Sequence, residues 1–209
     1  MRNKQRKIFV KNRKIWLFCY VPVFLLWFFA LEQVTPEHLF VVTNPLDHLI
    51  PFCEYFIIPY VLWFPYLIGG LVYFFWKEED GDFFKLGFTL IAGLTVCLII
   101  YMIFPNAQEL RVASYPNGNV FTRLVQALQE FDTPTNVCPS IHVFSTVAVC
   151  IAFLHSRRLR KKWWIPAMAV TLAVLICLST VFLKQHSVTD VTCAWVLNAV
   201  LYFIFYRRV

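Results

Sequence analysis

Charged residues are scarce in this chain of 209 residues, of which 15% are charged and 59% are hydrophobic. Soluble domains carry about 25% charged residues, so this composition, with a mean hydropathy of +0.63, excludes an ordinary soluble fold. The CxxC and HExxH patterns of zinc sites are also missing, which argues against a structural or catalytic zinc ion. No nucleic-acid-binding motif accompanies the net charge of +7, so we expect no nucleic-acid partner.

Apolar runs that approach the length of a membrane span recur along the chain. A spanning helix needs about 20 residues, and we identify six runs, of which the fourth is the shortest. They are residues 15–31, 55–76, 86–104, 139–155, 163–183 and 187–206. The sequence therefore predicts an all-α, integral membrane six-helix bundle over residues 15–209, preceded by a basic tail at 1–14.

The cations predict the orientation of this bundle. All but three of the 19 lysines and arginines fall in the tail, in the turns around 77–85 and 157–162, or at 207–208, which six spans place on one side. By the positive-inside rule that side is cytoplasmic. We expect a multi-pass cell-membrane protein with both termini in the cytoplasm. The first run lacks a small-x-small cleavage pattern and is interpreted as a retained anchor.

The outer side holds the less regular segments. Between the third and fourth runs, apolar residues recur at helical spacing over 120–131, which predicts a short amphipathic helix over the bundle. Cys53 and Cys138 also fall on this side, and the sequence leaves their pairing open.

Two short stretches carry the candidate chemistry. One is Pro139-Ser140-Ile141-His142, and the other is STVFLKQHSVTD at 179–190. Asp190 follows His186 by four residues, so its carboxylate can accept a hydrogen bond from the imidazole on one helix face. Ionisable residues at membrane depth are costly and are functional candidates.

The predicted topology gathers polar residues at the outer face. They are Arg111, His142, Lys184, His186 and Asp190. Two cations and two histidines suit a phosphate ester, because cations can hold the phosphoryl oxygens while one imidazole attacks phosphorus and the other protonates the leaving oxygen. Backbone N–H groups at a helix start near Ser140 would add an anion cradle.

Both stretches resemble motifs of the type 2 phosphatidic acid phosphatase superfamily, which also contains the vanadium haloperoxidases. Residues 139–142 resemble its Pro-Ser-Gly-His motif, and Ser179-Thr180-x5-His186-x3-Asp190 resembles Ser-Arg-x5-His-x3-Asp. The resemblance covers about residues 104–200, the phosphatase-like core.

Four positions depart from the family pattern. Of the family's Lys-x6-Arg-Pro motif only Arg111 is matched, since Phe104 and Val112 occupy the lysine and proline positions. Ile141 replaces glycine and Thr180 replaces arginine, with Lys184 one turn further on. The FPNAQELR and KQH-x3-D stretches look more like the inositol-phosphorylceramide synthase and sphingomyelin synthase branch, which moves a phospho-head-group between lipids.

The resemblance implies a role for each matched residue. His186 would be the nucleophile that forms a phosphohistidine, Asp190 would orient it, and His142 would be the general acid and then the base. The phosphoryl group would be bound by Arg111, Lys184 and Ser140, with Ser179 helping to position it. No metal or other cofactor is implied. The partners would be membrane lipids, including a lipid phosphate substrate such as a phospholipid or polyprenyl phosphate.

Several functions remain open at this point. A metal-independent lipid phosphatase or phosphotransferase is favoured, with water and an alcohol both open as acceptor. A head-group transferase is the nearest alternative. A transporter would need polar residues in mid-span, whereas the polar residues here cluster at span ends. A catalytically inactive lipid-binding protein stays open because two family cations are missing.

Overall fold

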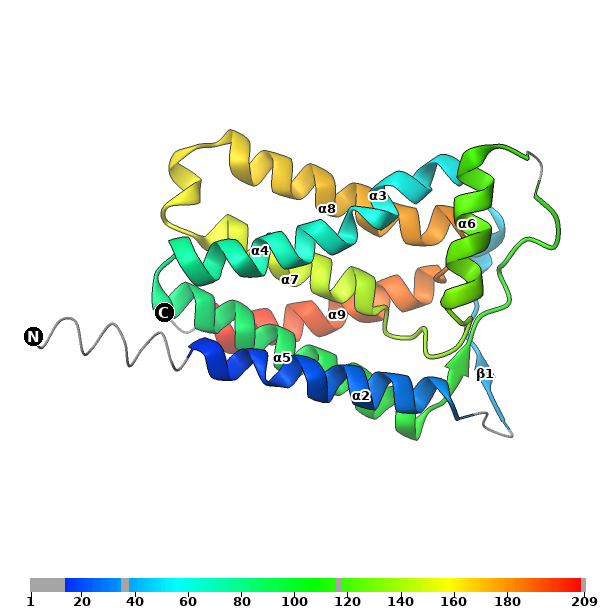
Figure 1. Ribbon diagram of the computed structural model, residues 1–209, viewed down its shortest axis with the longest axis horizontal. Coiled ribbons are helices and arrows are strands. Elements are labelled where there is room, and N and C mark those ends of the chain that lie inside the picture. Colours follow the sequence, from blue (N-terminus) through cyan, green and yellow to red (C-terminus); the bar gives the residue numbers. More distant parts are fainter. Residues whose placement is uncertain (1–13, 35–37, 116–117, 208–209) are drawn as a thin grey trace, which may run out of the picture.

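The computed structural model is an all-α bundle (Figure 1) and describes residues 14–34, 38–115 and 118–207. Residues 1–13 of the predicted basic tail lie outside the described residues. The longer helices are α2 (Tyr20–Glu32), α4 (Trp63–Lys77), α5 (Asp80–Ile103), α6 (Val120–Phe131), α7 (Ile141–His155), α8 (Trp164–Phe182) and α9 (Val188–Phe205). Shorter elements are α3 (Ile57–Val61), the 3-10 turns Pro45–His48, Glu54–Phe56 and Leu159–Lys161, and strands β1 (Phe40–Val41) and β2 (Asn106–Ala107).

Within the described residues, five helical segments are long and apolar enough to cross a membrane. They are Lys14–Glu32, Glu54–Lys77, Gly81–Ile103, Trp164–Phe182 and Val188–Phe205. The fourth predicted run, 139–155, forms the shorter helix Ile141–His155 of 15 residues. At 1.5 Å per residue that helix is about 22 Å long, less than the hydrocarbon core of a bilayer, which is about 30 Å thick.

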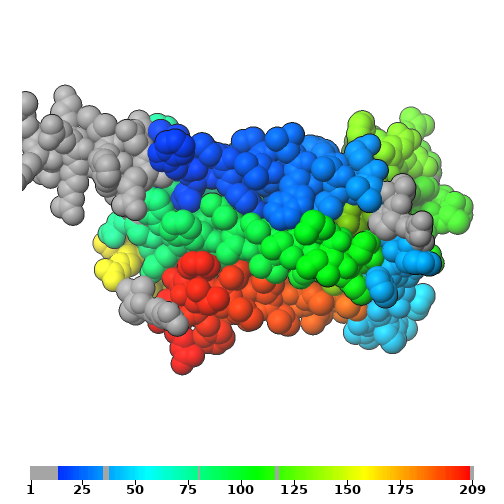
Figure 2. All heavy atoms as spheres, turned by 90° about the horizontal axis from the view of Figure 1, so that it is seen from below, coloured from blue at the N-terminus to red at the C-terminus, as the bar shows by residue number. Residues whose placement is uncertain are grey.

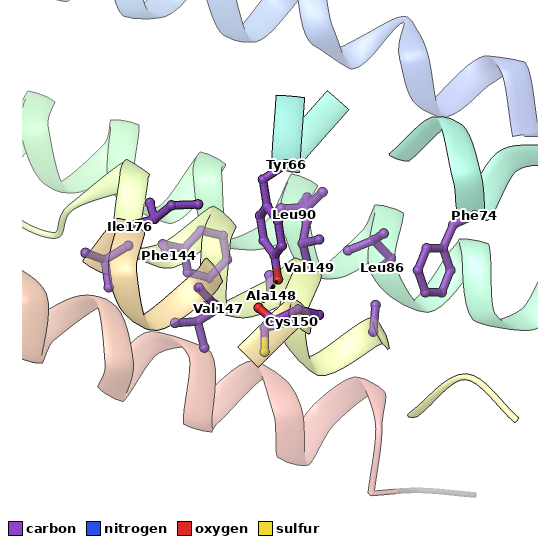
Figure 3. Close-up of a cluster of buried hydrophobic side chains, with 14 of the residues drawn as sticks. Tyr66, Phe74, Leu86, Leu90, Phe144, Val147, Ala148, Val149, Cys150 and Ile176 are labelled. Atoms are coloured by element: carbon purple, nitrogen blue, oxygen red, sulfur yellow. Dashed lines mark hydrogen bonds between the residues drawn. The ribbon is translucent and has the colours of Figure 1, made fainter. Parts of the chain in front are cut away.

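Helix α7 is the centre of the bundle. It packs against α4, α5, α8 and α9, and nine of its residues are buried, including all of 143–150. A helix that is apolar on every side is a buried helix, which explains how a short segment is accommodated: its neighbours, rather than lipid, surround it. Figure 3 shows Phe144, Val147, Ala148, Val149 and Cys150 within this core.

Helix α2 lies at the edge of the bundle. None of its residues is buried, and it packs along α5, where Figure 2 shows it on the surface beside that helix. Its inner side contacts a small cluster formed by Cys97, Leu98 and Tyr101 of α5. The helix is therefore held mainly against α5, and its last residue, Glu32, also accepts hydrogen bonds from Asn136 at 2.7 Å and from Thr133 in the loop after α6.

The two ends of the bundle differ. The start of α2, the α4–α5 turn, the α7–α8 turn and the end of α9 lie at one end, and α6 crosses the other (Figure 1). Helix α6 confirms the predicted amphipathic helix at 120–131, and the Asn119 side chain caps it by accepting from the backbone N–H of Thr122 at 2.9 Å. The parallel pairing of β1 with β2, which joins the two outer loops, was not predicted.

Candidate active site

Two histidine side chains meet at the end of the bundle that α6 crosses. His142 lies in the first turn of α7, and His186 precedes α9. The Nε2 atom of His186 is 3.5 Å from the Nδ1 atom of His142, and the ring centroids are 5.6 Å apart. Residues 44 positions apart in the chain thus form one pair of imidazoles.

Asp190 contacts the other side of the His186 ring. Its Oδ2 atom is 3.3 Å from His186 Nδ1 and accepts the backbone N–H of Ser187 at 2.9 Å. Ser187 is the N-cap of α9, and Asp190 is the third residue of that helix. The pair therefore meets across a capping box and not along a helix face as predicted, because α9 begins only after His186. With a proton on Nδ1 donated to Asp190, Nε2 carries the free lone pair, and that atom faces His142.

Ser140 links the start of α7 to the same aspartate. Its buried side chain caps α7 by accepting from the backbone N–H of Val143 at 3.3 Å, and its own N–H donates to the carbonyl oxygen of Asp190 at 3.3 Å. The backbone of the two motifs is thereby held together, which fixes the relative position of the two histidines.

A cavity of about 330 Å³ opens beside the two imidazoles. One wall is polar and comes from the loop after α6, with Asp132, Thr133, Thr135 and Asn136, together with Gln185. The other wall is aromatic and comes from α2, α3, α4 and α5. Its residues are Phe24, Phe28, Phe29, Tyr60, Trp63, Phe64 and Tyr101. The site is therefore amphipathic, with His142 and His186 where its two walls meet.

Arg111 lies behind the polar wall. Its guanidinium donates to the Gln185 side-chain oxygen at 3.1 Å, to the Gln129 carbonyl at 3.0 Å and to the Asp132 carbonyl. Burial lowers the pKa of Arg111, and the nearby Asp132 opposes this shift. Arg111 does not line the cavity, but it supports two residues that do.

Lys184 points toward the first outer loop, which connects α2 to α3. Helix α8 ends at Phe182, and Lys184 adopts a left-handed backbone conformation with φ of 57°. Its ammonium donates to the carbonyl of Asp47 at 2.6 Å and to that of Ile50. Burial lowers its pKa, and Asp47 opposes the shift.

The hydroxyls of Ser179 and Thr180 are used within α8. They donate to the carbonyls of Ile176 and Cys177, at 2.6 and 2.8 Å. Of the seven predicted site residues, the structure brings the side chains of His142, His186 and Asp190 together. Only the two histidines line the cavity, and Asp190, Ser140, Ser179, Lys184 and Arg111 lie outside its lining.

Asp132 is a cavity residue that the sequence did not single out. It is the C-cap of α6, and its Oδ2 atom accepts from the Tyr60 hydroxyl at 3.3 Å. Burial raises the pKa of the Asp132 carboxyl above its ordinary value, while His186 and Arg111 oppose the shift. The one available signal was an acidic residue directly after an amphipathic helix.

Two aromatic rings pack on His142. The ring centroids of Tyr60 and Trp63 lie 4.9 and 4.4 Å from its own. Both come from the second predicted run, where they look like ordinary apolar residues. They restrict the orientation of the His142 imidazole.

Asp47 ties the first outer loop to the start of α9. Its carboxylate accepts from the Ser187 hydroxyl at 2.6 Å and from the backbone N–H of Val188 at 2.8 Å. The residue is buried. Asp47 thus supports the capping box that positions His186.

In the part of the chain that the structure describes, Cys53 and Cys138 are free thiols. Within the same ranges, no group of three or more His, Cys, Asp and Glu side chains is arranged to hold a metal ion.

The profile of the PAP2 superfamily, the type 2 phosphatidic acid phosphatases, matches residues 86–209. The match extends beyond the predicted core of 104–200 at both ends and does not resolve a branch. Comparison with curated proteins and with solved structures gave no match. Members of this superfamily are generally metal-independent lipid phosphatases or phosphotransferases. Because the match covers more than half of the chain and includes both histidine motifs, the chain belongs to the PAP2 superfamily.

Proposed function

We propose that this protein transfers a phosphoryl or phospho-head-group from a membrane lipid through a covalent intermediate on His186. The observation that carries the proposal is the position of the His186 ring, with Asp190 at Nδ1 and His142 at Nε2. Covalent catalysis needs a nucleophile that one group orients and that a second group serves as acid and base. Here the two groups lie on opposite sides of the nucleophilic ring.

The reaction has two balanced steps. In the first, Nε2 of His186 attacks phosphorus, the bond from phosphorus to the leaving oxygen breaks, and His142 gives a proton to that oxygen. In the second, water or an alcohol attacks phosphorus, His142 takes the proton, and the P–N bond breaks. Asp190 stabilises the positive charge that the imidazole carries between the two steps.

The remaining predicted residues enter this proposal as positioning residues. Arg111 holds Gln185 and the Asp132 loop, Lys184 holds the first outer loop, and Ser140 holds the start of α7. Arg111 does not contact the cavity itself, but it orients the Gln185 side chain that lines it.

The experiment is to trap the intermediate. Purified protein is mixed with labelled lipid phosphates, quenched, and mapped for a phosphorylated or head-group-bearing histidine. We expect the adduct on His186 and its loss, with turnover, in His186→Ala. The matched control is His155→Ala, since His155 lies at the opposite end of α7 and outside the cavity. An adduct on another residue, or an undiminished rate in His186→Ala, would overturn the proposal.

Head-group transfer between lipids is the second candidate, and the charges of the cavity favour it. Among the described residues no lysine or arginine lines the cavity, whereas Asp132 does. A phosphomonoester dianion gains more from neighbouring cations, and loses more to a carboxylate, than a singly charged phosphodiester does. Turnover of matched monoester and diester lipids, with lipid alcohols present or absent, separates the two: product that carries the added alcohol supports transfer, and free phosphate alone supports a phosphatase.

The membrane arrangement is also part of the proposal. We infer that α7 completes six spans, with the termini in the cytoplasm and the site at the outer face, from the cations gathered at the opposite end of the bundle. A cysteine at the exposed Arg123 should react with an impermeant reagent on intact cells, above the wild-type background, and one at Arg160 should not. The reverse result would place the site in the cytoplasm.

A further inference from the structure

A second cavity, of about 390 Å³, continues from the one that holds the histidines. Phe24 and Leu25 of α2 and Trp63 and Phe64 of α4 line both cavities. The second cavity follows α2, α4 and α5 away from the site and is lined by apolar side chains apart from the Tyr20 hydroxyl and the Trp63 indole. Together the two cavities form one crevice, which is polar at the histidine end and apolar beyond it.

The crevice exists because of how α2 is held. Helices α2 and α4 both pack on α5, so a slot remains between them along the outer side of α5. Gly87 of α5 lines this slot beside Leu17. The exposed side chains of α2 and α4 that border the slot are apolar, which suits contact with lipid.

The length of the crevice matches a lipid chain. Tyr101 lines it near the histidines and Gly87 lines it further along α5, and the 14 residues of helix between them span about 21 Å. The hydrocarbon core of a bilayer is about 30 Å thick, so one leaflet is about 15 Å deep. The crevice is thus at least as long as one leaflet is deep.

The position of helix α6 supports entry of a lipid into the crevice from the side of the bundle. It crosses the histidine end (Figure 1), and Leu128 and Phe131 near its C-terminus line the cavity. Phe131 is 89% exposed. A large exposed aromatic side chain at the mouth of a cavity is suited to the membrane interface.

We propose that the crevice between α2 and α4 binds one hydrocarbon chain of the lipid substrate, which enters sideways from the bilayer. The proposal rests on the proposed function, because continuity with the histidine cavity is what identifies the occupant as substrate. The chain lies along α5, and the phosphate stops at His142 and His186, where the polar wall begins. The crevice therefore selects for chain length.

The test uses two valines on one helix. Val21 and Val23 of α2 are 44% and 54% exposed, and Val21 lines the second cavity whereas Val23 lines neither. Val21→Trp should fill the crevice, and Val23→Trp should point a ring of the same size elsewhere. Rates are measured on dioctanoyl and dipalmitoyl forms of phosphatidic acid and phosphatidylcholine.

We expect the preference for the long over the short chain, as a ratio of kcat/KM values, to fall about tenfold in Val21→Trp. Each buried methylene contributes roughly fourfold in affinity, so excluding two produces this effect. The ratio should stay within about twofold of wild type in Val23→Trp. Equal changes in both variants, or none in either, would overturn the proposal.

A binding measurement separates this proposal from the proposed function. His186→Ala, which cannot turn over by the scheme above, is photo-cross-linked with a phosphatidylcholine that carries a diazirine near the end of one chain. Labels on α2, α4 and α5 that Val21→Trp reduces and Val23→Trp does not would support the crevice even if no substrate is turned over. Labels spread over α8 and α9, or unaffected by Val21→Trp, would refute it.

Discussion

Helices α7 and α2 are both apolar, yet they are held in opposite ways. Helix α7 is enclosed by four neighbours and has nine buried residues, and α2 has one main neighbour and no buried residue. The first carries His142, and the second lines the crevice. The difference teaches that a candidate catalytic histidine lies on the most enclosed helix, whereas one wall of the proposed lipid crevice is a helix with few packing neighbours.

The largest expected effect on activity comes from replacing Asp190, beside His186. Asp190→Asn should keep the capping box, because the amide oxygen can still accept the Ser187 N–H. It should lose the negative charge that orients and stabilises His186. We expect kcat to fall by about 10²- to 10⁴-fold with little change in Tm. A variant that retains half of its activity would show that Asp190 only caps α9.

Two glycines of α5 allow the packing of this helix against α7 and near α2 to be compared directly. A Cβ atom at Gly93 would lie 1.8 Å from Phe144 Cζ of α7, whereas one at Gly87 would lie 2.7 Å from Leu17 Cδ1 near α2. Gly93→Ala should destabilise by about 3 kcal/mol, at the upper end of overpacking, because Phe144 is enclosed. Gly87→Ala should cost less than about 1 kcal/mol, because Leu17 can move and alanine favours helix. Thermal unfolding in detergent measures both, and equal losses would contradict the comparison.

Replacing Lys184 tests whether its ammonium contacts phosphate directly or supports the first outer loop. Lys184→Met removes the donor to the carbonyls of Asp47 and Ile50, which should cost about 1–3 kcal/mol because those carbonyls lose a partner. If support is its role, Tm falls and KM for a short-chain phosphate changes little. A large rise in KM at unchanged Tm would instead restore the phosphate-binding role that the motif implied.

The smallest expected effect is a pH dependence at Asp132. Because burial raises its pKa, the folded state holds this proton more tightly than the unfolded state. Its contribution to stability is therefore greatest below the ordinary pKa, about 3.9, and is lost as pH rises through the raised value. Asp132→Asn removes this loss, so Tm of the variant relative to wild type should increase from about pH 4 to pH 7. A difference that is constant with pH would show that Asp132 titrates normally.

Local signals predicted much of this molecule. The spacing of apolar residues predicted α6, and the two histidine motifs predicted the trio of His142, His186 and Asp190, which the structure brings together. The branch of the superfamily, the orientation and the catalytic roles remain predictions.

Contacts that depend on distant parts of the chain could not be predicted from the sequence. Tyr60 and Asp132 are 72 positions apart, and Asp47 and Ser187 are 140 apart. The predicted run 163–183 agrees with the observed end of α8 at Phe182, but placing Lys184 one helical turn from Thr180 wrongly assumed that the helix continued past this end. Side chains with several possible partners, such as Arg111 and Lys184, are placed by the fold and not by local sequence.

The contact of Asp47 with the start of α9 has a consequence for where this protein can be cut. The family profile begins at residue 86, yet the carboxylate that accepts the Ser187 hydroxyl and the Val188 N–H precedes it, as do the rings packed on His142. A fragment limited to the matched residues would keep both motifs and lose what holds them in place. The first residue of the family match is thus not the first residue of the folding unit. An expression fragment or a chimera should retain the chain from α2 onward.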